Sequence, residues 1–572
     1  MLADVEDALV RIDETALGSI DDELDKFILT LDVISTDNAV THNLIAAYPS
    51  EKIVNIENII KMYKSNGQNE DGTMTQKAIT DYVDSKIGSG GGSSQGGGGA
   101  ATNFGYENNG KILKVGENGY AKVSNVREEE LIEALIKLGS YTAVNAVGVE
   151  NDYESRTSTR IQEAKYYTQP SNYDVYSMYG GRMRCNVDDT GVITAFYGDS
   201  NYREDGSNGQ VMIYQPKFYY QRMPSKLVDK KVGKTIRKET IIVSDTEQTG
   251  FKLHPLFKTP DGEILDYVLI SAYEGGLFDA SENVYVKIPS QADYDYDKLS
   301  SIAGVKPISG VVDDFTLQNA ERLARNRGEG WHITNMAVES VNQMLGMVEY
   351  NTLNAQSVLG NGVSSIRTSG AGNCSSYTGS TSSLGNASGS AAQTTNEIDG
   401  VETTYSESGY KAVSYRGMEN VYGNNWRFVG DTLLYGDGTK EGGEPYICNS
   451  YNYSSAINST YSPIGFTIPS VYGWVSGFGY GNEEYDWVFM PAECSDLANS
   501  AAPIGDNLWS IADLNNTNAV LAGGNWAFGL SNGPFYYACD RTPSEPTRSY
   551  CARLMFIPTK NYVYHSNILK WN

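Results

Sequence analysis

Cysteine, histidine and basic residues are scarce in this sequence of 572 residues, and each scarcity argues against a class of protein. The six cysteines are too few for a disulfide framework and form no Cys-x-x-Cys pair, and only four histidines occur, so we expect no metal site. Because 70 Asp and Glu residues outnumber 44 Lys and Arg residues, the net charge is −26. Such a charge disfavours binding to nucleic acid or to an anionic lipid surface.

Long apolar runs are also absent from the sequence. No stretch of about 18 consecutive apolar residues occurs. The first residues, MLADVEDALVRIDE, lack the basic and apolar segments of a signal peptide. We therefore expect no membrane insertion and a chain that is made in a cytoplasm.

Glycine and tyrosine, in contrast, are abundant. The chain has 59 Gly residues, and its 41 Tyr residues outnumber 15 Phe residues. Tyr combines a large, rigid contact area with a polar tip, which is typical of exposed recognition surfaces. Many short strands with Tyr at their edges would account for this composition equally well.

The composition along the chain predicts an α+β protein in five parts. These parts are a helical attachment and oligomerisation module (1–87), a Gly/Ser linker (88–101), a small connecting module (102–139), a β-rich supporting part (140–310) and a C-terminal domain (311–572). Apolar residues spaced as in about two heptads of a coiled coil lie in the first part: Ile20, Leu24, Phe27, Leu31 and Ile34. Such a helix would be more stable in a bundle of identical chains, although it could also pack within its own chain.

Two helices are predicted at the start of the C-terminal domain. The first spans 313–326, and the second is capped by Thr334 and carries a Met/Leu/Val stripe that we assign to the core. The Ser/Thr/Gly-rich stretch 363–410 is expected to form a polar insertion without a core of its own.

Motifs for catalysis are weak. The sequence has no Gly-x-Ser-x-Gly nucleophile elbow, and the glycines at 477, 479 and 481 do not have the spacing of a phosphate-binding loop. The acids Glu483, Glu484 and Asp486 could carry acid/base chemistry, but acids in an acidic protein usually form a solvated face. We therefore expect no enzyme, no catalytic residue and no cofactor.

Four motifs in fixed order carry a family resemblance. They are RLARNRGEGWHIT (322–334), GNNW (423–426), GGNW (523–526) and CARL (551–554). This set resembles the C-type-lectin-like fold of formylglycine-generating enzymes and their relatives. It looks most like the variable proteins of diversity-generating retroelements, which tailed phages and prophages of gut bacteria carry. Further stretches such as RCNVDDTGVITAFYGD, GQVMIYQPKFYY and FKLHPLFKTPDGE extend the resemblance over about 140–572.

The resemblance implies a ligand-binding surface with variable residues between Gly523 and Leu554. The expected variable positions are Asn525, Ala527, Phe528, Leu530, Asn532, Pro534, Tyr536, Tyr537, Ala538, Asp540, Arg541, Arg548 and Tyr550. Aromatic residues in this set would act as anchors and the arginines as polar hot spots. The alternative is a surface loop without a role.

Two departures limit what the resemblance implies. Cys539 and Cys551 are too far apart for the cysteine pair of the oxidase members, so copper-dependent chemistry is not expected. Glu545-Pro546-Thr547 resembles a calcium-binding motif of sugar-binding lectins but has Thr in place of Asn, so no calcium site is predicted.

The predicted function is therefore that of a virion protein at a tail fibre or tail tip. It would bind a protein or glycan receptor on the host bacterial surface, attach to other tail or baseplate proteins through residues 1–87, and form a homotrimer. The alternatives are an enzyme of the formylglycine-generating type, a glycan-degrading tail protein and a fixed structural tail component.

Overall fold

The computed structural model describes residues 111–115, 121–127, 145–366, 372–398, 401–405, 409–436, 442–495, 504–509 and 515–558. The chain splits into two compact units, Met1–Val144 and Asn145–Asn572. In the first unit, β1 (Lys111–Val115) pairs antiparallel with β2 (Ala121–Arg127). The module predicted over 1–87 and the linker predicted over 88–101 lie outside the described residues.

The predicted α+β class with a coiled-coil module is wrong, because the described part of the chain is built mainly of strands. Its α-helices are α7 (Ser177–Gly180), α8 (Leu317–Arg325), α9 (Met336–Tyr350) and α10 (Gln356–Leu359). Segments rich in Val, Ile, Thr and Tyr between Gly and Asn turns favour strands. The heptad pattern that suggested a helical module covers only about two heptads, which is too short to decide the class of the whole chain.

The largest sheet of the second unit has 14 strands within the described residues. Its main path runs β10-β8-β9-β23-β25-β27-β26-β20-β21-β22, with β24 on β23, β28 on β20, and β3 on both β4 and β9. These strands are β3 (Ala146–Asp152), β4 (Thr157–Gln162), β8 (Tyr219–Asp229), β9 (Lys234–Ser244), β10 (Lys252–Leu253), β20 (Trp426–Gly436), β21 (Gly443–Cys448), β22 (Tyr461–Pro463), β23 (Gly473–Tyr480), β24 (Pro491–Ser495), β25 (Asn507–Trp509), β26 (Thr517–Ala522), β27 (Tyr537–Ala538) and β28 (Tyr550–Cys551).

Three smaller sheets complete the described part of this unit. A six-stranded sheet has the order β15-β29-β11-β7-β5-β6, a three-stranded sheet β13-β12-β14, and a four-stranded sheet β17-β16-β18-β19. Their strands are β5 (Met183–Val187), β6 (Ile193–Phe196), β7 (Gln210–Pro216), β11 (Tyr267–Ser271), β12 (Gly276–Asp279), β13 (Val284–Val286), β14 (Lys298–Ser300), β15 (Trp331–Ile333), β16 (Gly389–Ile398), β17 (Val401–Tyr405), β18 (Lys411–Tyr415), β19 (Met418–Glu419) and β29 (Leu554–Phe556).

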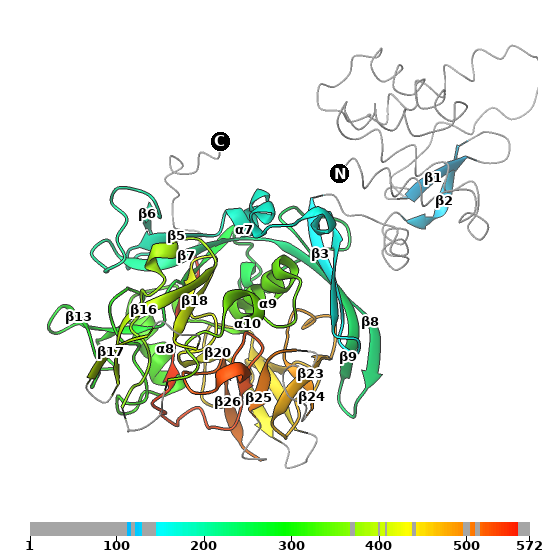
Figure 1. Cartoon of the computed structure of the whole chain (residues 1–572). Helices are drawn as coiled ribbons and strands as arrows, with labels where there is room; N and C mark the ends of the chain where they lie inside the picture. The colour runs from blue at the N-terminus through cyan, green and yellow to red at the C-terminus, as the bar shows by residue number, and fades with distance from the viewer. Residues whose placement is uncertain are drawn as a thin grey trace, which may run out of the picture. The chain divides into compact units, whose positions relative to one another are not determined.

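Helix α9 lies in the core of the second unit and packs against β3, β9 and β20 (Figure 1). The stripe predicted for the core, which includes Val338 and Met344, is buried. The polar residues of the helix are buried too, and they are paired: Glu339 with Arg427, and Glu349 with Arg416. A helix that is buried all round must satisfy its polar groups in this way, because an unpaired buried charge is costly.

Strands from both sides of the predicted boundary at residues 310 and 311 share sheets. In the six-stranded sheet, β11 pairs with β29 through Leu269 and Phe556. In the large sheet, β9 pairs with β23 through Ile236 and Phe478. The predicted boundary therefore falls inside one compact unit.

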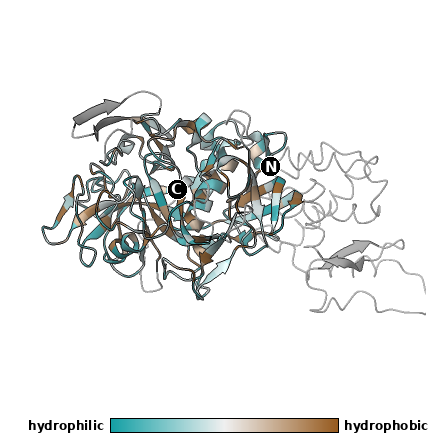
Figure 2. Cartoon of the chain, turned by 90° about the horizontal axis from the view of Figure 1, so that it is seen from below, coloured by the Kyte–Doolittle hydropathy of each residue, from teal (hydrophilic) through white to brown (hydrophobic). Residues whose placement is uncertain are grey.

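Hydrophobic and hydrophilic residues are interspersed over the ribbon of this unit (Figure 2). Within the described residues, no helix combines the length and the hydrophobicity needed to cross a membrane.

Candidate ligand-binding surface

The loop that follows β26 is held by hydrogen bonds to two other parts of the chain. The Gly523 amide donates to the Tyr536 carbonyl (2.8 Å), and the Trp526 amide donates to the Asn424 carbonyl (3.0 Å). The Trp526 carbonyl accepts from the Ile366 amide (2.8 Å), and the Gly529 amide donates to the Ser364 carbonyl (2.8 Å). Segments near 364 and 424 thus fix the backbone of the loop, although they are remote from it in sequence.

Gly524 and Asn532 lock the two ends of this loop together. The Asn532 side-chain amide donates to the Asn525 carbonyl (2.6 Å), while the Asn525 side chain accepts from the Ala527 amide (2.9 Å). Gly524 has φ +81°, and a Cβ there would lie 1.8 Å from the Asn532 Oδ1. Only glycine fits this position without displacing Asn532.

A small apolar cluster joins the stretch 363–410, predicted as a polar insertion without a core of its own, to the loop. Val363, Ile366 and Cys374 pack with Ala412 and with the buried Trp526. These three residues therefore share a core with residues outside the insertion, including Trp526 of the loop.

The GNNW motif (423–426) lies on a buried carboxylate. Glu274 accepts hydrogen bonds from the side chains of Asn420 (3.1 Å) and Asn424 (2.5 Å) and from the Asn425 amide (3.1 Å). Burial raises the pKa of the Glu274 carboxyl, and Arg553 opposes that shift. The residues that carry the resemblance thus hold the framework under the surface.

The thirteen predicted variable positions divide by exposure. Those exposed are Ala527, Leu530 and Arg541, and those half-buried are Phe528, Pro534, Asp540 and Arg548. Those buried are Asn525, Asn532, Tyr536, Tyr537, Ala538 and Tyr550. The structure thus leaves seven of these side chains in reach of a ligand in the single chain.

The buried members of the set make framework contacts. Tyr537 accepts a hydrogen bond from the Gln343 side chain (2.8 Å). Tyr536 packs edge-on against Trp426, with ring centroids 4.6 Å apart. Replacing these residues would alter packing and hydrogen bonds inside the unit, not only its surface.

Three aromatic side chains from separate segments form a continuous row beside the loop, which we call the aromatic row: Tyr472, Trp509 and Phe528. Tyr472 is 71% exposed and Trp509 is 39% exposed. Tyr472 stacks on Trp509 (centroids 5.9 Å apart, 26° between planes), and Trp509 contacts Phe528 (5.3 Å). Leu530, which is 48% exposed, follows Phe528 along the same loop.

Charged groups flank the aromatic row. Trp509 Nε1 donates to the Asp540 carboxylate (3.0 Å), and Arg541 pairs with both Asp540 (3.2 Å) and Glu545 (2.8 Å). Burial raises the pKa of the Asp540 carboxyl, while Arg541 and Trp509 oppose the shift. Apolar rings bordered by paired charges and donors are the usual composition of a protein recognition patch.

Tyr472 and Trp509 are not among the ligand-binding positions predicted from the sequence. The available signal was the clustering of Trp and Tyr in the last third of the chain, which does not say which rings meet. The contacts of Trp509 with Tyr472 and with Phe528 depend on the folding of three distant segments, so no local pattern could have shown them.

The acidic residues considered for catalysis have structural roles or lie in solvent. Asp486 is buried, accepts a hydrogen bond from Tyr220 and pairs with Lys252 at 2.8 Å. Glu483 and Glu484 are exposed. In the described part of the chain, no three His, Cys, Asp or Glu side chains gather in a way that could hold a metal ion.

The sequence matches no protein-family model and no curated protein. Among solved structures, the chain is similar to one titled Major Tropism Determinant P3c Variant, with a TM-score of 0.22 and 11% identity over 66% of this chain and 71% of that chain. A likeness of this degree decides neither the fold nor the function of the chain, so the proposal below depends on the surface itself and on the motifs of the sequence.

Proposed function

We propose that this chain is a non-enzymatic receptor-binding protein of a phage tail. Its ligand surface would consist of the aromatic row together with the exposed positions of the loop at 523–541, and it would bind the host bacterial surface. The protein would form a homotrimer in the virion and attach to the tail through residues 1–87. A retroelement would diversify its ligand surface.

The observation that carries the proposal is the aromatic row, which includes Phe528 of a loop whose backbone is held by hydrogen bonds to other segments. A recognition surface needs exposed side chains that can change and a backbone that stays in place when they do. Here Phe528 and Leu530 extend from a loop whose backbone is bonded to segments near 364 and 424. Substitutions at exposed positions of such a loop cost little stability.

Binding of the purified chain to a panel of bacterial strains tests the receptor-binding role. We expect Tyr472→Ala to reduce binding to a susceptible strain at least about tenfold, as expected for an aromatic hot spot. Tyr296→Ala is the matched control, because Tyr296 is also 71% exposed and lies outside the surface. Equal binding by both variants would contradict the proposed surface.

Deep sequencing of the codons for residues 515–556, in a population of phages or prophages that carry this gene, tests whether a retroelement diversifies the surface. In the family that the chain resembles, mutagenesis acts at adenines of a template copy of the gene. We therefore expect variation at codons that derive from such adenines, for exposed positions such as Ala527 and Leu530, and little variation in the codons for residues 200–241. Equally low variation in both windows would show a fixed surface and would remove the retroelement from the proposal.

A further inference from the structure

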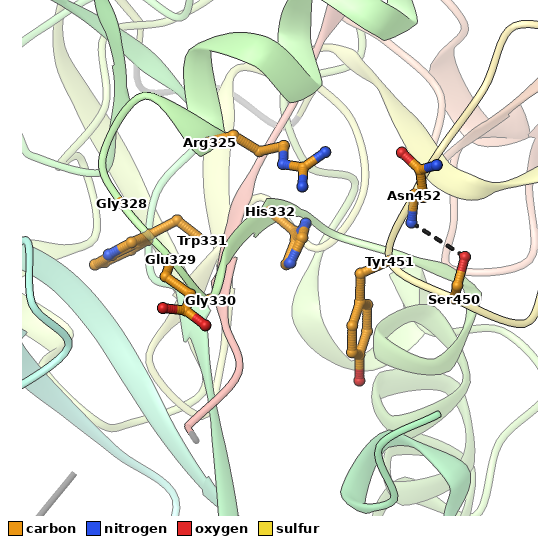
Figure 3. A pocket seen from close by; sticks show the side chains of 9 residues that line it. All are labelled: Arg325, Gly328, Glu329, Gly330, Trp331, His332, Ser450, Tyr451 and Asn452. Atoms are coloured by element: carbon orange, nitrogen blue, oxygen red, sulfur yellow. Dashed lines mark hydrogen bonds between the residues drawn. The ribbon is translucent and has the colours of Figure 1, made fainter. Parts of the chain in front are cut away.

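A cleft that contains none of the predicted variable positions opens beside the C-terminal end of α8. Its volume is about 610 Å³, within the range of about 300–1,000 Å³ that is common for small-molecule sites. Arg325 comes from the last turn of α8, Glu329 and His332 come from the following loop and β15, and Tyr451 and Asn452 come from the loop after β21 (Figure 3).

A buried carboxylate fixes the imidazole that lines this cleft. Glu321 Oε1 lies 2.7 Å from His332 Nδ1, and Oε2 accepts the Ile333 amide (2.9 Å). The His332 ring stacks on Tyr451, with centroids 5.0 Å apart and 27° between planes. One side of the cleft is therefore a rigid aromatic pair whose orientation is set by Glu321 from α8.

Arg325 lies one helical turn after Glu321 and extends toward the space between His332 and Asn452 (Figure 3). Burial raises the pKa of the Glu321 carboxyl, and His332 and Arg325 oppose that shift. No hydrogen bond joins the Arg325 guanidinium to any of the other eight cleft residues, all of which the structure describes (Figure 3). The N–H donors of the guanidinium are therefore available to a ligand in the cleft. A guanidinium can bind a carboxylate through two parallel hydrogen bonds.

Two further groups limit the chemistry of that ligand. The Glu329 carboxylate accepts hydrogen bonds but cannot donate them, so it favours hydroxyl donors and disfavours a second anionic group. Asn452 can both donate and accept, and the Tyr451–His332 pair supplies aromatic ring surface against which the C–H groups of a sugar ring can pack. One carboxylate on a small, hydroxyl-rich ring satisfies all of these groups.

We propose that this cleft binds a saccharide unit that carries a carboxylate, as a uronic acid does. Arg325 pairs with the carboxylate, while Glu329 and Asn452 hydrogen-bond to the ring hydroxyls. The site is separate from the aromatic row, so it stands whether or not that surface binds a receptor.

Calorimetric titration of the full chain with D-glucuronic acid, D-glucose and acetate tests the proposal. We expect D-glucuronic acid to bind at least about tenfold more tightly than the neutral sugar or the simple carboxylate, because only it offers both a carboxylate to Arg325 and ring hydroxyls to Glu329 and Asn452. Arg325→Gln should weaken that binding at least about tenfold, and Asn452→Ala should weaken it to a smaller extent.

Arg322→Gln is the matched control, because Arg322 lies on the same helix, is exposed and does not line the cleft. Circular dichroism confirms that each variant is folded. The proposal is overturned if no saturable binding of D-glucuronic acid occurs or if Arg325→Gln binds it as the unchanged chain does. Acetate binding as tightly as D-glucuronic acid would identify a simple carboxylate site and overturn the saccharide class.

Discussion

Asp506 is a buried acid beneath the candidate surface, and it makes the stability of that region depend on pH. Its Oδ2 accepts the Phe535 amide (2.7 Å), while its Oδ1 has no hydrogen-bond partner among the described residues. Burial raises the pKa of the Asp506 carboxyl from 3.8 to about 8. The folded protein therefore keeps a proton that the unfolded chain releases, and stability falls as pH rises from about 4 to about 8.

Asp506→Asn should remove this part of the pH dependence, because the amide oxygen still accepts from Phe535 and carries no charge. The free energy of unfolding should then change less steeply with pH, by at most about 1.4 kcal/mol per pH unit. Urea denaturation at several pH values between 4 and 8 measures it. Asp229→Asn, at a side chain that is 87% exposed, is the control and should leave the slope nearly unchanged. An unchanged slope in Asp506→Asn would show that another group is responsible.

A side chain at Gly524 would have two costs, backbone strain and a clash with Asn532. Gly304, which lies outside the candidate loop, allows the two to be separated, because it has nearly the same backbone angle but no close neighbour. Both have positive φ (+81° and +87°), but a Cβ at 304 meets nothing within 4 Å, whereas a Cβ at 524 meets Asn532. We expect Gly304→Ala to lower the free energy of unfolding by about 1 kcal/mol from backbone strain alone. Gly524→Ala should cost at least about twice as much, as measured by denaturant unfolding, and equal costs would show that Asn532 yields freely.

At the scale of elements, a buried ion pair joins α9 to β20. Arg427 Nε and Nη2 each lie 2.6 Å from a Glu339 oxygen, and both side chains are only 2% exposed. A Cβ at Gly523 would lie 2.3 Å from Arg427 Nη1, so the same guanidinium also supports the start of the candidate loop. The position of the loop therefore depends on the contact between a helix and a strand of the core.

Removing one partner of this pair should destabilise the fold strongly. We expect Glu339→Gln to lower the free energy of unfolding by about 3–5 kcal/mol, because the buried Arg427 loses the carboxylate that is hydrogen-bonded to it. The double replacement Glu339→Leu with Arg427→Met should recover most of that loss. Chemical denaturation of Glu339→Leu, Arg427→Met and the variant with both changes gives the coupling energy, and additive losses would contradict the pairing.

The elements that could be predicted from the sequence were those with strong local patterns. A helix was predicted over 313–326 and observed as α8 (Leu317–Arg325), and the next helix was predicted to begin at Thr334 but is capped by Asn335. The small shifts arise because several neighbouring residues can serve as caps. The overall class was wrong, since the pairing of short strands across the whole chain leaves little local trace.

At the scale of the whole molecule, the limit of sequence reasoning is visible at the candidate surface. The prediction placed the surface on one segment, and that segment contributes exposed residues such as Phe528 and Leu530. The sequence could not show that Tyr536 and Tyr537 are buried in the core, nor that Tyr472 and Trp509 join the surface from other segments of the chain. Burial and long-range contact are properties of the packed unit, and periodicity reports only on neighbours along the chain.

The same long-range pairing predicts that the part from 311 to 572 does not fold alone. In that fragment β29 loses β11, β23 loses β9, and Asn424 loses Glu274. Unpaired strand edges and unsatisfied buried groups destabilise a fold and promote aggregation. We expect residues 145–572 to unfold cooperatively on heating, while residues 311–572 show no cooperative transition. A protease should digest the shorter fragment at least about tenfold faster, because most of it is then open to cleavage. A fragment 311–572 that melts cooperatively at the temperature of the longer chain would show that the shared sheets are not needed for its fold.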